Sequence, residues 1–365
     1  MKALIAMSGG VDSSVAAHLT RAAGYECTGC TMKLWDADDS PAEAGTKTCC
    51  SADDTEDAKS VAYRLGMRHY VFNFKEDFRE QVIGDFVRCY LCGRTPNPCI
   101  ECNRHFKFTR LLERADLLGC DKIVTGHYAR VEETDSGFVL RRGLDAEKDQ
   151  SYVLYMLTQA QLSRLLLPLG GLSKAQVRQI AAEQGFLNAN KRDSQDICFV
   201  PDGDYARVVE QVSGQAAVPG DFVDTDGNVL GQHRGIIHYT VGQRRGLGIA
   251  LGEPAYVVGI DAEQNRVILG RNEDLFTDSA ELSGVSWVSG RLPEAPVRCT
   301  AKIRYRHPAQ PAWLRFTGTD TAVLQFDAPQ RAVTAGQAAV CYDGDTVLGG
   351  GTIVRAFRSA GAKLL

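Results

Sequence analysis

The sequence predicts an α/β domain with a doubly wound parallel sheet, followed by one or two small β domains. In the first half, short apolar runs alternate with amphipathic stretches, a pattern that favours parallel strands with helices on both faces. After about Asp204, short β-prone runs alternate with glycine turns, which is typical of a barrel or sandwich. At 365 residues the chain is too long for one core, so two or three domains are expected.

The individual elements follow from apolar periodicity and from turn residues. Strands are expected at 4–7, 27–32, 69–74 and 122–125, and helices at 13–23 and 53–65. A capping box at Ser173 to Gln176 begins another helix, which Gly185 ends, and residues 188–199 are expected to form a loop. Later strands are expected at 222–227, 235–242, 255–259, 266–270, 299–305, 322–326 and 338–342.

Composition narrows the class of protein. Hydrophobic residues make up 44% and charged residues 24%, the balance of an ordinary globular protein. No apolar run approaches the roughly 20 residues of a membrane span, and the apolar start is too short for a signal peptide, so no membrane association and a cytoplasmic location are expected. The net charge of −4 neither supports nor excludes an RNA substrate, because binding depends on the charge of the contact face.

The strongest motif is SGGVDSS at residues 8–14, which follows a short apolar strand and opens a helix. Tandem glycines let the backbone approach an anion, and backbone N–H groups at a helix N-terminus bind negative oxygens. The motif has no lysine and is not a Walker A loop. It resembles the pyrophosphate loop of the PP-loop ATP pyrophosphatases, in which ATP is cleaved between its α and β phosphates. The resemblance implies that Asp12 helps to organise Mg²⁺.

Twelve cysteines in a chain expected to be cytoplasmic are unlikely to form structural disulfides, so catalysis, metal binding or burial must explain them. Cys102 follows a segment with two prolines and a glycine, which predicts an irregular loop near basic residues and therefore a usable thiolate. Cys198 lies in a polar stretch far along the chain. Two reactive thiols that meet at one ATP site are what sulfur transfer requires.

Several segments together resemble the tRNA 2-thiouridylase family over nearly the whole chain. They are SGGVDSS, GRTPNPC with the following CN, KF at 107–108, TGHYAR at 125–130, KDQSY at 148–152, DSQDICF at 193–199, GQRRGLGI at 242–249 and KIRYR at 302–306. The resemblance implies three domains: a PP-loop catalytic domain at 1–205, a central β domain at 206–277 and a tRNA-contacting C-terminal β-barrel at 278–365.

The resemblance also implies the chemistry and its residues. ATP would adenylate the C2 oxygen of the wobble uridine, a persulfide on Cys198 would deliver sulfur, and Cys102 would act as nucleophile and end in a disulfide with Cys198. Nucleotide-binding residues are then expected at Ala6, Met7, Ser8, Gly9, Gly10, Val11, Asp12, Ser13, Met32 and Gly126. tRNA contacts are expected at Asn97, Pro98, Cys99, His127, Lys148, Asp149, Gln150, Arg304, Tyr305 and Gln337. The implied partners are tRNAs for lysine, glutamate and glutamine, with a sulfur-relay protein or a cysteine desulfurase as donor.

Cys99 departs from the family pattern, because many members have an aspartate at this position. The cysteine completes C-x₂-C-x₆-C-x₂-C with Cys89, Cys92 and Cys102, a spacing used by metal ligands. A structural zinc site is therefore one alternative to the persulfide route. Another is an iron–sulfur cluster on Cys99, Cys102 and Cys198, which would replace the persulfide. Two rival readings are another PP-loop adenylating enzyme, which needs neither Cys102 nor Cys198, and a non-catalytic zinc-ribbon RNA-binding protein, which leaves SGGVDSS unexplained.

Overall fold

The N-terminal half is built on a five-stranded parallel sheet, and the computed structural model describes residues 1–35, 52–191 and 197–359. The strand order is β3 (Arg68–Asn73), β2 (Glu26–Lys33), β1 (Lys2–Ala6), β4 (Lys122–Val124) and β7 (Leu165–Leu166). These strands and their parallel pairing confirm the predicted α/β sheet. The other short elements of this half are η4 (Ser151–Leu154) and α7 (Gln159–Ser163).

Helices cover both faces of this sheet. On one face, Ala3 and Ile5 of β1 pack with α1 (Val11–Ala22), α2 (Ala52–Arg64) and α8 (Lys174–Glu183). On the other face, Leu4 packs with η3 (Asn103–Arg110) and α6 (Leu111–Leu117). Alternate residues of a strand point to opposite faces, so an apolar β1 serves two cores.

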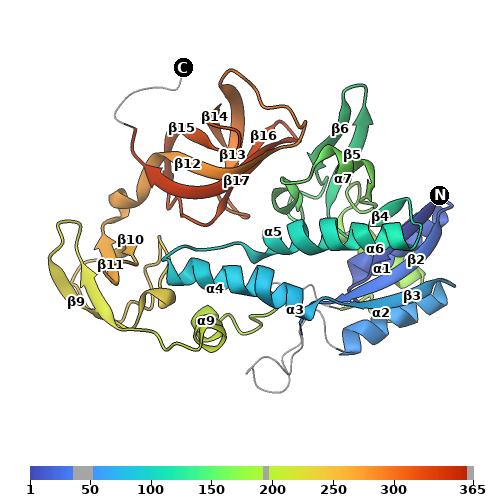
Figure 1. Ribbon diagram of the computed structural model, residues 1–365, viewed down its shortest axis with the longest axis horizontal. Helices are drawn as coiled ribbons and strands as arrows, with labels where there is room; N and C mark the ends of the chain where they lie inside the picture. The colour runs from blue at the N-terminus through green and yellow to red at the C-terminus, as the bar shows by residue number, and fades with distance from the viewer. Residues whose placement is uncertain (36–51, 192–196, 360–365) are drawn as a thin grey trace.

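A helical arm leads from the sheet to the β domains (Figure 1). It comprises α3 (Lys75–Phe78), η2 (Arg79–Ile83), α4 (Gly84–Leu91) and the run of α5 (Pro98–Cys102), η3 and α6. The sequence analysis predicts no helix here. Phe78, Phe86 and Phe106 are fully buried and make edge or tilted ring contacts within one cluster, so aromatic packing stabilises the arm.

The central β domain is a four-stranded sheet with the order β10 (Tyr256–Asp261), β11 (Arg266–Gly270), β8 (Gly220–Val223) and β9 (Val229–His233). Helix α9 (Tyr205–Ser213) precedes it. The strand predicted at 235–242 is wrong: the segment is a 3₁₀ turn, η5 (Ile236–His238). Gly235 has a φ of +120°, which turns the chain so that Ile236 and Ile237 pack with Tyr90 of the arm.

The C-terminal domain is a closed six-stranded β-barrel preceded by η6 (Asn272–Leu275). Its order is β12 (Phe276–Trp287), β15 (Ala322–Arg331), β14 (Gln310–Phe316), β13 (Val297–Lys302), β16 (Ala338–Asp343) and β17 (Thr346–Phe357), closed by the pairing of β12 with β17. This confirms the expected barrel. The domain limits 1–205, 206–277 and 278–365 stay a prediction.

The barrel is joined to the N-terminal half by a hairpin of β5 (Ala129–Thr134) and β6 (Gly137–Arg142), which extends the barrel sheet beside β17. Asp345 receives one hydrogen bond from Arg130 at 2.6 Å and one from Arg141 at 2.7 Å. The barrel therefore has a direct connection to the N-terminal half, formed by a strand pair and by ion pairs. No helix in the described residues is long and apolar enough to cross a membrane.

Candidate active site

The SGGVDSS motif forms a compact turn between β1 and α1, at the carboxyl end of the parallel sheet. The Ser8 N–H donates to the Ser13 hydroxyl at 3.2 Å, and the Ser13 and Ser14 hydroxyls donate to the Gly10 carbonyl at 3.0 Å each. Gly9 has a φ of +74°, and a Cβ there would lie 2.2 Å from the Asp54 carbonyl oxygen. Only glycine fits this position, so the loop is held in a shape with its backbone exposed to an anion.

Asp12 is the charged centre of this loop. Both of its carboxylate oxygens accept hydrogen bonds from the Lys174 ammonium, at 2.8 and 2.9 Å, and Oδ1 also accepts from the Tyr128 hydroxyl at 2.7 Å. Lys174 begins α8, and Tyr128 follows β4. Three separate parts of the chain therefore meet at one carboxylate.

The segment that leads to Cys198 is attached to the other side of the loop. The Asn188 amide donates to the Gly9 carbonyl and to the Ser14 hydroxyl, both at 2.9 Å. The Lys191 ammonium contacts Asp54 at 2.5 Å and Asp57 at 2.6 Å. The structure therefore holds the chain beside the nucleotide loop a few residues before the second candidate cysteine.

The other predicted nucleotide residues lie at the same edge of the sheet. A Cβ on Gly126 would lie 3.0 Å from the Asp12 carbonyl carbon and from the Ser13 nitrogen, so the backbones are in close contact. Met7 is buried, and its N–H donates to the Cys30 carbonyl at 2.7 Å. Ala6 and Met32 are partly buried, and Met32 packs against two apolar clusters at once. The structure thus places Ala6 to Ser13, Met32 and Gly126 at the ends of three adjacent strands, β2, β1 and β4.

The predicted irregular loop around Cys102 is wrong in part. The chain is irregular up to Asn97, but Pro98 then begins α5, and Cys102 is its last residue before η3. Proline at a first helical position has no N–H to leave unsatisfied, which explains why this proline-rich stretch can start a helix. Cys99 is exposed and Cys102 is only 9% exposed, so the two side chains of the same turn have opposite environments.

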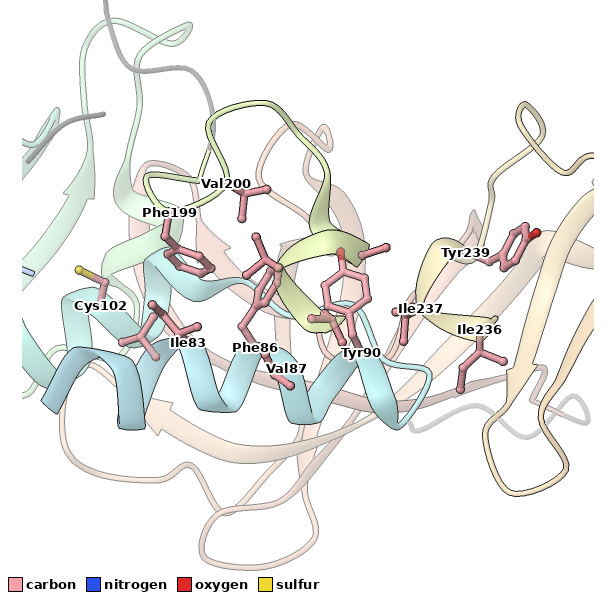
Figure 2. Packing of buried hydrophobic residues seen from close by; sticks show 14 of the residues in the cluster. Ile83, Phe86, Val87, Tyr90, Cys102, Phe199, Val200, Ile236, Ile237 and Tyr239 are labelled. Atoms are coloured by element: carbon pink, nitrogen blue, oxygen red, sulfur yellow. The ribbon is translucent and has the colours of Figure 1, made fainter. Parts of the chain in front are cut away.

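Cys102 and Cys198 belong to one apolar cluster. Cys102 lies in the cluster with Ile83 and Phe199, and the half-buried Cys198 packs against it (Figure 2). None of the ten cysteines in the described part of the chain forms a disulfide. Met32, at the end of β2, packs against the same cluster. Met32, Cys102 and Cys198 therefore border one continuous apolar cluster, which runs from the end of β2 along the arm to the central β domain.

The barrel contacts the segment in front of α5. The Gln337 amide donates to the carbonyls of Thr95 at 2.9 Å and Pro96 at 3.2 Å, and the Thr95 N–H donates to the Ala335 carbonyl at 2.9 Å. Gln337, predicted to contact tRNA, thus binds the protein's own backbone here. Asn97 is half-buried and Pro98 is buried in the adjoining turn.

The other predicted tRNA residues divide into internal and surface positions. Asp149 is buried and accepts from the N–H groups of Gly143 and Ser151, while the Gln150 amide oxygen accepts from the Tyr128 N–H. His127 is also buried, its Nδ1 lies 2.8 Å from the Thr125 hydroxyl, and burial with nearby Lys107 holds its pKa well below the usual range. Lys148 is half-buried, and Arg304 is exposed.

Tyr305, another residue predicted to contact tRNA, is half-buried at the edge of the barrel. Its ring lies 6.0 Å from the Tyr152 ring, and the Lys302 ammonium lies about 6 Å from both rings. Burial raises the pKa of Tyr305, with smaller effects from Asp149 and Cys99. This edge of the barrel therefore presents the exposed Arg304 beside the partly buried Lys302 and Tyr305.

The metal alternatives lack an assembled ligand set. Among the described residues, no group of three or more cysteine, histidine or carboxylate side chains is arranged to hold a metal ion. Burial beside Asp85 raises the pKa of the Cys89 thiol to about 11, which disfavours the thiolate that a metal needs. Cys49 and Cys50 lie outside the described residues.

Sequence reasoning missed Lys174, Tyr128, Asn188 and Lys191. Lys174 was visible only as part of a capping box, and Tyr128 only as a neighbour of His127 in TGHYAR. Their contacts join residues 116 to 182 positions apart. A sequence motif contains only neighbouring residues, so it cannot indicate partners this far apart in the chain.

These features define a PP-loop nucleotide-binding protein with two appended β domains. The profile described as "tRNA methyl transferase HUP domain" matches residues 1–202, "tRNA methyl transferase PRC-barrel domain" matches 207–271, and "Aminomethyltransferase beta-barrel domain" matches 277–353. The chain is 50% identical to the tRNA-specific 2-thiouridylase MnmA of Lachnoclostridium phytofermentans, over 97% of this chain and 99% of that protein. It is 49% identical to that of Clostridioides difficile, over 96% and 98%. The chain belongs to the tRNA-specific 2-thiouridylase family.

A solved structure of a 4-thiouridine synthetase–RNA complex with bound ATP is also similar. It is 19% identical with a TM-score of 0.36, and the match covers 58% of this chain and 50% of that chain.

Proposed function

We propose that this protein is an ATP-dependent tRNA-uridine 2-sulfurtransferase, which converts the wobble uridine of tRNA into 2-thiouridine with release of AMP and pyrophosphate. One observation carries the proposal: Met32, at the nucleotide edge of the sheet, packs against the cluster that contains Cys102 and receives Cys198. A nucleotide loop and two thiols that border one apolar cluster suit the tRNA uridine thiolation that the names of the relatives state.

In the first step, the uridine C2 oxygen attacks the α-phosphorus of ATP. The bond from this phosphorus to the bridging oxygen breaks, and pyrophosphate leaves with the electron pair. The loop of Ser8 to Ser13 leads into the N-terminus of α1, whose backbone N–H groups would bind the phosphate oxygens. The C2 oxygen is now part of an AMP leaving group, which departs far more readily than an oxide.

In the second step, the terminal sulfur of a Cys198 persulfide attacks C2, and AMP leaves. The Cys102 thiolate then attacks the Cys198 sulfur. The sulfur–sulfur bond breaks, its electron pair stays on the C2-bound sulfur as the thiocarbonyl, and a Cys102–Cys198 disulfide remains. An external reductant restores the thiols. A sulfur-relay protein or a cysteine desulfurase would supply the persulfide, and tRNAs for lysine, glutamate and glutamine would be the substrates.

Mg²⁺ fits this site because Asp12 offers a carboxylate beside the phosphate loop, and Mg²⁺ in nucleotide sites uses one or two carboxylates with phosphate oxygens. When bound, the ion would neutralise phosphate charge. The iron–sulfur alternative is less well supported, because Cys99 is exposed whereas Cys102 is buried on the same turn.

The test is conversion of unmodified tRNA in the presence of ATP, Mg²⁺ and a persulfide donor (a cysteine desulfurase with cysteine), followed by digestion and mass spectrometry for 2-thiouridine. Cys102→Ala and Cys198→Ala should lose the product, and Cys99→Ala should keep it, with no iron bound to any of them. Product and bound iron lost together in all three variants would favour the cluster. Absence of 2-thiouridine with a folded wild type that binds ATP would refute the proposed reaction.

A further inference from the structure

Lys174 lies beside the nucleotide loop but has no role in the reaction steps proposed above. It is the first residue of α8, whose start is fixed by a capping box between Ser173 and Gln176, and its N–H donates to the Asp145 carboxylate at 2.9 Å. The side chain is only 12% exposed. The backbone of this lysine is therefore fixed, and its ammonium is directed toward the nucleotide loop.

The ammonium ends beside the phosphate loop itself. Its partner Asp12 is the second residue of α1 and follows Gly10 by two positions. Walker loops carry their phosphate-binding lysine within the loop, and SGGVDSS has none. The fold brings a lysine to the loop from 162 residues away.

The charge balance at this loop changes when a nucleotide binds. Asp12 beside the oxygens of ATP is a like-charge contact unless a cation lies between them. Mg²⁺ held by Asp12 and by phosphate oxygens would repel an ammonium that contacts the same carboxylate. A lysine ammonium on a flexible stem can move to a neighbouring anion, and the phosphates are the nearest new one.

We propose that Lys174 is the phosphate-binding lysine of this site: its ammonium is held on Asp12 before nucleotide binding and contacts the β- and γ-phosphate oxygens of ATP afterwards. This inference rests on the proposed use of ATP. In the first step Lys174 then stabilises the negative charge that accumulates on the departing pyrophosphate.

Lys191 provides the contrast that makes this assignment specific. It also lies beside the loop, where its ammonium is 3.4 Å from the Gly9 carbonyl oxygen, but its two carboxylate partners, Asp54 and Asp57, belong to α2. Neither carboxylate is part of the phosphate loop, so nucleotide binding leaves both ion pairs of Lys191 in place. Of the two lysines, only Lys174 is paired with a carboxylate of the loop.

The experiment measures the affinity of a non-hydrolysable ATP analogue with Mg²⁺ by calorimetry, with AMP as a second ligand. Lys174→Ala and Lys174→Gln should weaken binding of the analogue by about 10- to 100-fold, the effect of one charged hydrogen-bond donor. AMP lacks the β- and γ-phosphates, so its affinity should change less than about threefold. Lys174→Arg keeps the charge and should recover part of the loss. Lys59→Ala removes an exposed lysine that pairs with Glu56 and should bind like wild type.

A purely structural role for Lys174 predicts a different pattern. If the lysine only neutralises Asp12, the double variant Asp12→Asn, Lys174→Ala should bind the analogue as tightly as Asp12→Asn alone, and that result would overturn the proposal. Equal loss of AMP and analogue binding in both neutral variants, or wild-type affinity in both, would do the same. A wild type that binds neither ligand would refute the proposed use of ATP, which is a separate failure.

Discussion

The nucleotide loop at residues 8–13 is held by hydrogen bonds and close backbone contacts, whereas Cys102 and Cys198 lie in an apolar cluster of the helical arm. At the loop, Asp12 and Asn188 each make more than one polar contact. In the cluster, ring contacts such as that of Phe86 with Phe199 dominate. The phosphate site is therefore preorganised, whereas the buried Cys102 thiol must become accessible before it can attack the Cys198 sulfur in the proposed reaction.

The strongest test of a preorganised loop is Gly9→Ala. An added Cβ would lie 2.2 Å from the Asp54 carbonyl oxygen, at a φ of +74° that alanine adopts with strain. We expect the affinity for ATP to fall by more than about 100-fold, because strain of this kind amounts to roughly 1–3 kcal/mol and the clash adds to it. Calorimetric titration measures the affinity, and circular dichroism checks the fold.

Gly10→Ala is the matched control in the same loop. Its Cβ would meet only the Ser8 hydroxyl, at 3.5 Å, which is an ordinary contact. The melting temperature of this variant should stay near that of wild type. Equal losses of stability in the two alanine variants would show that the close approach to Asp54 is not what requires glycine.

The structure of the nucleotide loop could be predicted from the sequence better than the surroundings of Cys102, and the reason is physical. Residues 8–14 are adjacent in the chain and use glycine and hydroxyl groups whose roles are local, so the pattern predicts the site directly. Cys102 was expected on a loop because of Pro96 and Pro98, yet Pro98 starts a helix and the thiol packs into an aromatic cluster. Its burial depends on Phe199, about a hundred residues away in the chain, which no local pattern reports.

Thiol alkylation tests the other half of the comparison. Iodoacetamide should modify the exposed Cys99 and Cys92 roughly 30-fold faster than Cys102, since a buried side chain reacts only after local opening that costs on the order of 2 kcal/mol. Peptide mass spectrometry over a time course measures the rates. In denaturant, all three cysteines should react at similar rates.

The same alkylation experiment in the presence of tRNA tests whether RNA binding changes the accessibility of Cys102. If RNA binding opens the cluster, Cys102 should be alkylated faster with tRNA than without it, while Cys99 should be protected at the barrel edge. A Cys102 that reacts as fast as Cys99 in the protein alone would remove the distinction between a preformed loop and an enclosed thiol.

Gln337→Ala tests how the barrel supports the thiol segment. Loss of its hydrogen bonds to Thr95 and Pro96 should loosen the approach to α5 and reduce 2-thiouridine formation by roughly 5- to 10-fold, the effect of about 1 kcal/mol. ATP affinity should stay unchanged, because the nucleotide loop lies on the sheet. Gln310→Ala, on β14 of the same barrel, is the control. Equal effects of the two glutamine variants would contradict a supporting role for Gln337.

The pH dependence of stability depends on His307, at the barrel edge beside Arg304 and Lys302. Burial, followed by the charges of Arg304 and Lys302, lowers the pKa of His307 to about 4 from an ordinary 6.5. Because the unfolded chain binds the proton more readily, the stability contributed by neutral His307 is complete above pH 6.5 and declines as the pH falls from 6.5 toward 4. Chemical denaturation across this window should show a loss on the order of 1–2 kcal/mol in wild type. His307→Gln should flatten the curve, and an unchanged slope would show that the barrel edge carries no buried histidine of this kind.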